Sequence, residues 1–217
     1  MANALIEAKD LRYGTPEGKI LAEKLGFKVE PGDLLLVGGP NGSGKSTLLR
    51  VLLGHDRYLG GTLAIGPRPR EIAVLPQLQN NEFHLPLTLR DVLEIALKRR
   101  VTAEEAVAVG LLDEHHLDLA WNTASGGERK RTLLTRLLMQ SPKLLILDEP
   151  MNHLDNLSRK KVLGAVLRFL EGAPTRGVIM VSHERSLEGF QNQFRSLKRL
   201  SLGDPKAPLE PIESEAP

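Results

Sequence analysis

The 217-residue chain contains no cysteine, which excludes disulfide bonds, thiolate catalysis and cysteine metal sites and suits a reducing compartment. Its sequence has no run near the roughly 18 consecutive apolar residues that a membrane-spanning helix requires. The formal net charge is only +2, so nothing marks the whole chain as a binder of nucleic acid or of an anionic membrane surface. The first residues have no basic segment and no long apolar stretch, so we expect no signal peptide. We therefore expect any role at a membrane to be exercised through a partner.

The composition is that of a globular protein, with 41% hydrophobic and 26% charged residues. The length suits one domain with a small subdomain. We expect residues 1–202 to form this domain, with a helical subdomain at about 78–137. Residues 203–217 are rich in proline and acidic residues and poor in apolar ones, which predicts a disordered tail.

Residues 39–47, which read GPNGSGKST, fit the phosphate-loop pattern GxxxxGK[ST] at each fixed position. An apolar run at 33–37 precedes the loop and another at 48–53 follows it, which predicts a strand, a loop and a helix. Glycine lets the backbone wrap closely round a phosphate, and N–H groups at a helix start attract the anion. We expect Lys45 to reach the β- and γ-phosphates and the Ser46 hydroxyl to ligate Mg²⁺. The predicted phosphate-binding residues are Gly39, Pro40, Asn41, Gly42, Ser43, Gly44, Lys45, Ser46 and Thr47.

Three further predicted strands end in polar side chains. Residues 143–150 are an apolar run closed by Asp148 and Glu149, which predicts a buried parallel strand with carboxylates at the edge where such sheets bind ligands. Asp148 is expected to hold Mg²⁺, and Glu149 to orient and deprotonate the water that attacks the γ-phosphate. Gln77, after a predicted strand at 71–75, is suited to ligate Mg²⁺ or hold that water. The apolar run from residue 177 ends near His183, a donor suited to a γ-phosphate oxygen.

The segment Ser125, Gly126, Gly127 and Glu128 has the capping-box pattern that begins a helix, here expected up to Met139. A serine–glycine turn at a helix start is also an anion site, made of backbone N–H groups and a hydroxyl. One chain with one nucleotide offers no second phosphate to this turn, whereas the nucleotide of a partner would.

Other segments are less specific. Residues 4–13 predict an exposed edge strand of an antiparallel layer, in which Tyr13 is either an adenine-stacking ring or an ordinary strand aromatic. Thr88 and Thr102 begin capping boxes of two further predicted helices. His115 and His116 are not expected to bind a metal, because adjacent residues of a helix do not share a face.

From about residue 5 to about residue 197, the order of these motifs resembles that of the ATP-binding cassette (ABC) ATPases, the nucleotide-binding subunits of ABC transporters. The resemblance implies an α/β fold: a P-loop NTPase (RecA-like) core with an antiparallel β subdomain and a compact α-helical subdomain. It implies that Tyr13 stacks on adenine, that Gln77 is the Q-loop glutamine and that residues 125–128 are the signature, which contacts ATP bound to the opposite subunit. By the same resemblance Glu149 is the general base, Asp155 lies in the D-loop and contributes to nucleotide binding, and His183 is the switch histidine.

The resemblance also implies ATP and Mg²⁺ as ligands, an ATP-dependent head-to-tail homodimer and a transmembrane permease partner, with no nucleic acid. Such a subunit is cytoplasmic and peripheral on the inner face of the cell membrane. The chain departs from the family pattern in two places. Ala124 and Glu128 stand where the commonest signature has Leu and Gln. The stretch from Gln77 to Ser125 is shorter than is usual for importers.

Residues 83–92 resemble a segment of metal-ion and iron-chelate importers. The alternatives are a small lipid or haem-type exporter cassette and a soluble cassette ATPase that remodels a cytoplasmic complex. A third is an ATP-binding module without turnover, which Glu149 and His183 argue against.

Overall fold

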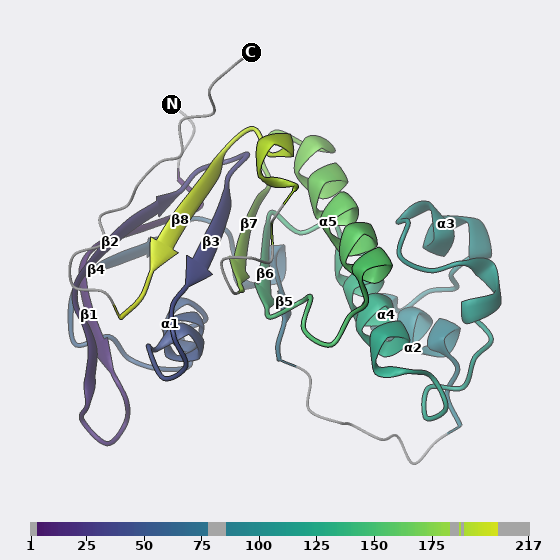
Figure 1. Cartoon of the computed structure of the whole chain (residues 1–217), viewed down its shortest axis with the longest axis horizontal. Coiled ribbons are helices and arrows are strands. Elements are labelled where there is room, and N and C mark those ends of the chain that lie inside the picture. The colour runs from purple at the N-terminus through teal and green to yellow at the C-terminus, as the bar shows by residue number, and fades with distance from the viewer. Residues whose placement is uncertain (1–3, 78–85, 183–186, 188, 204–217) are drawn as a thin grey trace.

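The structure, a computed structural model, describes residues 4–77, 86–182, 187 and 189–203 (Figure 1). His183 and, apart from Gly203, the predicted tail lie outside the described residues, as do the first three residues of the importer-like segment at 83–92.

A five-stranded sheet in the order β5-β6-β7-β3-β8 forms the centre of the molecule, and every pairing in it is parallel. All five residues of β3 and of β7 are buried, because layers cover both faces of the sheet. The uninterrupted apolar runs of the sequence therefore form buried strands as predicted, whereas β8 was not among the predicted strands. The strands are β3 (Leu34–Gly38), β5 (Ile72–Leu75), β6 (Leu144–Asp148), β7 (Gly177–Val181) and β8 (Leu197–Ser201).

A separate antiparallel sheet contains β1 (Ile6–Gly14), β2 (Ile20–Val29) and β4 (Gly60–Ile65), in the order β2-β1-β4. The prediction that the first strand lies at an exposed edge is wrong. β1 is the central strand, because β2 pairs with one of its edges and β4 with the other. The pairing of β1 with β4 begins where Ile6 lies opposite Ile65. The predicted antiparallel layer itself is present.

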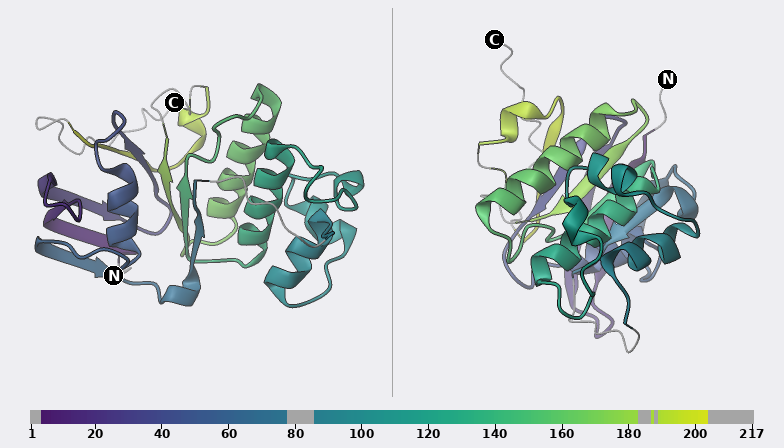
Figure 2. Two further views of the ribbon diagram at one scale, coloured as in Figure 1. Left: turned by 90° about the horizontal axis from the view of Figure 1, so that it is seen from below. Right: turned by 90° about the vertical axis from the view of Figure 1, so that its right-hand side faces the viewer.

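Five helices and three short 3-10 turns complete the described part of the chain. Figure 2 shows α1 between the two sheets, α4 and α5 on the opposite face of the parallel sheet, and α2 and α3 beyond them. Thr88 and Thr102 cap α2 and α3 as predicted, each with a reciprocal capping box. The helices are α1 (Lys45–Leu52), α2 (Leu89–Leu97), α3 (Ala103–Ala108), α4 (Gly126–Met139) and α5 (Asn156–Glu171), and the turns are η1 (Pro69–Glu71), η2 (Glu114–His116) and η4 (Gln191–Gln193).

Alternate residues of the parallel strands supply two hydrophobic cores. Leu35 and Ile146 pack in the core that contains α1 and the antiparallel sheet. Leu36 and Leu147, one position further along their strands, pack in the core that contains α4 and α5. This double burial fixes the register of β3 and β6, so the loop after β3 and the acids at the end of β6 reach the same edge of the sheet.

Candidate nucleotide-binding site

The predicted phosphate loop connects β3 to α1 and has the backbone that the motif requires. Gly39 and Gly44 have φ of 136° and 96°, in the region that favours glycine, and a Cβ on Gly39 would lie 2.5 Å from the carbonyl oxygen of Leu202. Lys45 Nζ donates to the carbonyl oxygens of Gly39, at 2.8 Å, and of Pro40, at 2.9 Å. The ammonium group is thus already at the loop where phosphate oxygens would bind.

A cavity of about 680 Å³ opens beside this loop. Gln77 and Glu149, predicted from distant parts of the sequence, line it together with Lys45 and Ser46. The remaining lining residues are Thr15, Lys19, Leu21, Asn41, Gly42, Gly44, Thr47 and Asn152. Of the predicted phosphate-loop residues, Gly39, Pro40 and Ser43 are absent from this lining.

The prediction that Tyr13 stacks on adenine is wrong for this structure. The side chain is 0% exposed, so neither face of its ring is open to a ligand. The ring packs beneath the loop, 3.4 Å from where a Cβ of Gly44 would lie, and burial raises the pKa of its hydroxyl. Within the described residues that hydroxyl has no hydrogen-bond partner. Lys19 and Leu21 line the cavity on this side. They were not identified as site residues from the sequence, and the only available signal was their position just after the turn at residues 14–18.

Two amides hold the carboxylate of Glu149. Gln77 Nε2 donates to Oε2 at 3.4 Å, and Asn152 Nδ2 donates to the same oxygen. Glu149 has a left-handed backbone with φ of 49°, and its N–H donates to the carbonyl oxygen of Val181 at 2.9 Å. The carboxylate is therefore held at the cavity beside the phosphate loop. Sequence reasoning treated Asn152 as part of a turn, and its spacing of three residues from Glu149 was the available signal.

Asp148 is half-buried at the end of β6, and desolvation, followed by the neighbouring Glu149, raises its pKa, whereas Lys45 lowers it. A divalent cation beside this carboxylate would offset its desolvation. Ser46 lines one cavity with Gln77 and another with Asp148, so it shares a cavity with each of the other two predicted Mg²⁺ ligands. Oxygen donors from a hydroxyl, an amide and a carboxylate are those that Mg²⁺ prefers, so the residues fit the cation.

Lys130, which sequence reasoning missed, joins α4 to this site. Its Nζ donates to the carbonyl oxygens of Glu149, at 3.1 Å, and of Asn152, at 2.9 Å. The residue is only 9% exposed, and burial lowers the pKa of its ammonium group. Lys130 thus secures the turn that carries the predicted base.

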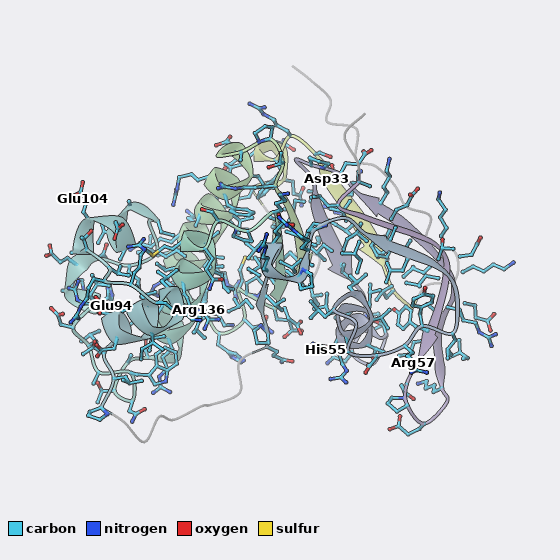
Figure 3. The ribbon with its side chains drawn as sticks, turned by 180° about the vertical axis from the view of Figure 1, so that it is seen from behind. Asp33, His55, Arg57, Glu94, Glu104 and Arg136 are labelled. Atoms are coloured by element: carbon cyan, nitrogen blue, oxygen red, sulfur yellow. The ribbon has the colours of Figure 1, made fainter. Side chains whose placement is uncertain are left out.

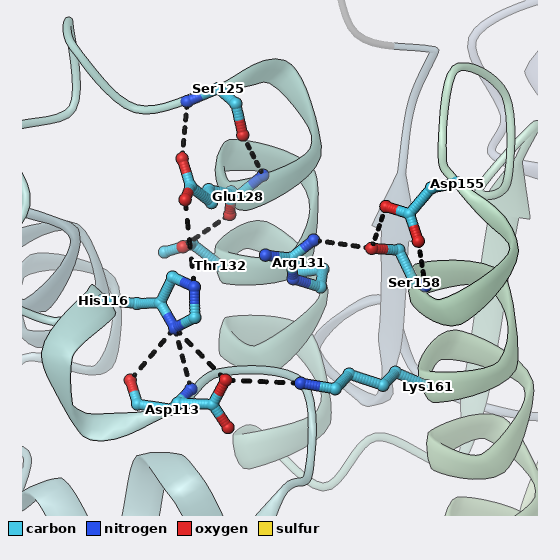
Figure 4. Close-up of polar contacts among 9 residues, drawn as sticks. All are labelled: Asp113, His116, Ser125, Glu128, Arg131, Thr132, Asp155, Ser158 and Lys161. Carbon is cyan, nitrogen blue, oxygen red and sulfur yellow. Dashed lines mark hydrogen bonds and ion pairs between the residues drawn. The ribbon is translucent and has the colours of Figure 1, made fainter.

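The predicted capping box at residues 125–128 is present at the start of α4. Ser125 N–H donates to Glu128 Oε2 at 2.7 Å, and Glu128 N–H donates to Ser125 Oγ at 3.2 Å (Figure 4). Ser125, Gly126 and Gly127 line a second cavity, of about 690 Å³, and not the one at the phosphate loop. Arg136 of α4, labelled in Figure 3, lines this second cavity too.

Asp155, predicted to help bind nucleotide, lies at this second cavity and caps α5. Its Oδ1 accepts from Ser158 N–H at 2.9 Å and its Oδ2 from Ser158 Oγ at 2.8 Å, while Arg131 donates to the same hydroxyl at 2.9 Å (Figure 4). The backbone N–H of Ser158 lowers the pKa of the carboxyl. In this structure the carboxylate is therefore engaged in capping.

The sequence argument that His115 and His116 diverge is wrong. They lie in the 3-10 turn η2, with ring centroids 4.0 Å apart. Together with Asp113 they place three possible metal-ligand atoms within 4.8 Å of one another.

A phosphate loop on a parallel sheet, an antiparallel sheet beside it, and a helix begun by a Ser-Gly-Gly turn define an ABC ATPase. The sequence profile of the family described as "ABC transporter" matches residues 22–152, more than half of the chain, and the chain belongs to that family as an ATP-binding, ATP-hydrolysing subunit. Over the described residues, no helix combines the length and apolar character needed to cross a membrane.

Named relatives agree with this assignment. The chain is 35% identical over 189 residues to the zinc import ATP-binding protein ZnuC of Pseudomonas savastanoi pv. phaseolicola, covering 86% of this chain and 69% of the relative. It is 39% identical over 185 residues to ZnuC of Paracoccus denitrificans, covering 83% and 70% of the two chains.

Solved structures support the fold. An ATP-binding subunit of an ABC transporter superposes with a TM-score of 0.74 at 23% identity, covering 96% of this chain and 90% of that one. The ATP-binding cassette MJ0796, a dimer in a post-hydrolysis state with ADP and Pi, superposes with a TM-score of 0.72 at 20% identity, covering 95% and 98%. The predicted α/β P-loop fold is confirmed.

Proposed function

We propose that this ATPase works as a head-to-tail homodimer with Mg²⁺ and energises uptake of a divalent metal ion through a separate transmembrane permease. In this proposal the subunit is peripheral, on the cytoplasmic face of the membrane. The relatives named as zinc import ATP-binding proteins support the metal, and the fit of Ser46, Gln77 and Asp148 to a hard cation supports Mg²⁺.

The observation that carries the proposal is the placement of Glu149 opposite the phosphate loop. Its carboxylate, held by the amides of Gln77 and Asn152, shares a cavity with Lys45 and Ser46. Lys45 would exchange its bonds to loop carbonyls for bonds to phosphate oxygens. Glu149 would orient the attacking water and accept its proton, which gives general-base catalysis beside a stabilised terminal phosphate. His183 is proposed as the switch donor on the resemblance alone.

The position of Ser125 supports the dimer. Its anion-binding turn lies at the second cavity, apart from the phosphate loop of the same chain. A partner's nucleotide would supply the phosphate that this turn lacks, and each chain would complete the site of the other.

Mixed dimers test this arrangement. We expect Ser125→Arg in one subunit and Lys45→Ala in the other to leave one intact composite site and about half of the wild-type activity, whereas both changes in one subunit should damage both sites. The control is Ser141→Arg, an exposed serine after α4, which should hydrolyse ATP normally. Equal activity of the two mixed arrangements would refute the contact between subunits.

The catalytic and transport claims need separate assays. Glu149→Gln should bind ATP with normal affinity but hydrolyse it hardly at all, so normal turnover would remove Glu149 as the base. Membrane vesicles containing the permease and this subunit should take up Zn²⁺ only with hydrolysable ATP. Vigorous hydrolysis without metal uptake, and without a membrane protein in pull-downs, would favour the soluble remodelling ATPase instead.

A further inference from the structure

We propose that Asp113, His115 and His116 form a binding site for a zinc-class divalent cation, and that this site acts on the signature turn through Glu128. Their donor atoms lie within 4.8 Å of one another, and Asp113 and His115 are exposed to solvent. Two imidazoles and a carboxylate are ligand types of protein-bound Zn²⁺ and disfavour Ca²⁺ and Mg²⁺, which prefer oxygen.

Coordination requires rotamer changes of exposed side chains and the release of one backbone hydrogen bond. Bonds of about 2.0–2.2 Å to a tetrahedral Zn²⁺ place neighbouring donors about 3.3 Å apart. Nδ1 of His116 already lies 3.7 Å from Oδ2 of Asp113. The side chain of His116 is only 10% exposed and anchors the site, while the exposed His115 and Asp113 can change rotamer to close it. A cation on Nδ1 would replace the N–H of Asp113, which donates to that nitrogen at 3.0 Å.

The second contact of His116 is of the kind that metal-bound histidines make. Histidine ligands of metals commonly donate their other ring N–H to a carboxylate, which fixes the tautomer and the orientation of the ring. Nε2 of His116 faces Oε1 of Glu128 at 3.8 Å (Figure 4). Glu128 is the position where the common signature has glutamine, so this departure supplies the carboxylate that a carboxylate–histidine–metal arrangement needs.

Glu128 connects the proposed site to the signature turn. While Oε1 faces His116, Oε2 accepts the N–H of Ser125 at 2.7 Å. Asp113 is in turn held by Lys161 of α5, whose Nζ lies 3.3 Å from Oδ2 (Figure 4). A cation would displace Lys161 and draw Glu128 towards His116, which weakens its hold on Ser125.

The expected consequence is feedback inhibition, and this part rests on the proposed function. A signature turn released from Glu128 is less ordered for the partner's nucleotide, so hydrolysis slows. The inhibiting cation belongs to the class that the permease is proposed to carry, so uptake would be limited when that cation accumulates.

Zn²⁺ binding is measured first, by calorimetry on the full chain without nucleotide and by the absorption spectrum of bound Co²⁺. The variants are Asp113→Asn, His115→Ala and Glu128→Gln, and the matched control is His55→Ala, an exposed histidine after α1, labelled in Figure 3. Wild type and control should bind equally, and each of the three variants at least about tenfold more weakly, since even a carboxylate behind a histidine ligand contributes 10–100-fold. Absence of Zn²⁺ binding to wild type, or equal binding to His115→Ala, would overturn the site.

Hydrolysis of Mg²⁺-ATP is then measured with and without Zn²⁺. Zn²⁺ should inhibit wild type and His55→Ala but not His115→Ala, whose activity without Zn²⁺ should equal that of wild type. Equal inhibition of all variants would show competition with Mg²⁺ and would overturn the coupling to the signature. A wild type that binds Zn²⁺ but hydrolyses no ATP would count against the proposed function and leave the metal site standing.

Discussion

The buried hydroxyl of Tyr13 gives a sharp prediction for stability. The side chain is 0% exposed and its hydroxyl has no hydrogen-bond partner among the described residues. A buried polar group without a partner costs roughly 1–3 kcal/mol. Tyr13→Phe removes that cost and keeps the ring that packs beneath the phosphate loop, so we expect the free energy of unfolding to rise by about 1 kcal/mol or more. In urea this shifts the midpoint upward by about 0.5 M, because the slope for small proteins is about 1–3 kcal/mol per M.

The assay is urea unfolding followed by circular dichroism, with fluorescence of Trp121, the single tryptophan, as a second probe. Coincident transitions would justify a two-state analysis. The control is Tyr58→Phe, the other tyrosine, which is 43% exposed and should leave the midpoint unchanged. ATP affinity should be the same in both variants. Loss of stability in Tyr13→Phe would show that the hydroxyl has a partner and refute the reasoning.

The same residue predicts a pH dependence. Burial raises the pKa of folded Tyr13 above its ordinary value of 10.0, so above that pH the unfolded chain releases a proton that the folded chain keeps. Stability therefore falls as pH rises beyond about 10, by up to about 1.4 kcal/mol per pH unit from this group. Tyr13→Phe should lose that part of the slope, and Tyr58→Phe should keep it. Identical slopes in the two variants would contradict the burial of the hydroxyl.

Three further substitutions test the site. Lys45→Ala should lose most of the affinity for ATP in equilibrium binding, because it removes the cation at the loop; unchanged binding would contradict the phosphate-loop assignment. Lys130→Met should lower kcat about tenfold with little change in ATP affinity, since losing about 1.4 kcal/mol of support for the turn at Glu149 costs a factor of ten; a change confined to KM would refute this role. Gly39→Ala should lower the free energy of unfolding by roughly 1 kcal/mol or more in urea, because its φ of 136° and the 2.5 Å approach to Leu202 exclude a Cβ without movement; a variant as stable as wild type would mean that the loop adapts.

The sequence predicted those parts of the fold and site that depend on neighbouring residues. The phosphate loop and the acidic pair at Asp148 and Glu149 are contiguous motifs beside uninterrupted apolar runs, so their strands and their common edge followed from local patterns. The central place of β1 did not follow, because β4 reaches it only after α1. Tyr13 was misassigned for a related reason: which face of a strand is buried depends on the layer above it.

Other contacts required the tertiary structure. Asn152 and Lys130 are ordinary polar residues in the sequence and gain their roles because α4 packs beside the turn at Glu149. His115 and His116 converge because they occupy a 3-10 turn, whose side chains are spaced differently from those of an α-helix.

Helix α4 physically links the two sites that the proposed dimer would form. Ser125 at its start faces the second cavity, and Lys130, five residues or about 7.5 Å further along the axis, holds the turn that carries Glu149. Arg131 joins the same helix to Ser158 at the start of α5, next to Asp155. A displacement of the Ser125 turn on meeting a partner's phosphate would therefore move the backbone of the base in the chain's own site. In the proposed dimer, such a connection would let each active site respond to nucleotide in the other without a separate relay, because one hydrogen-bonded helix carries both contacts.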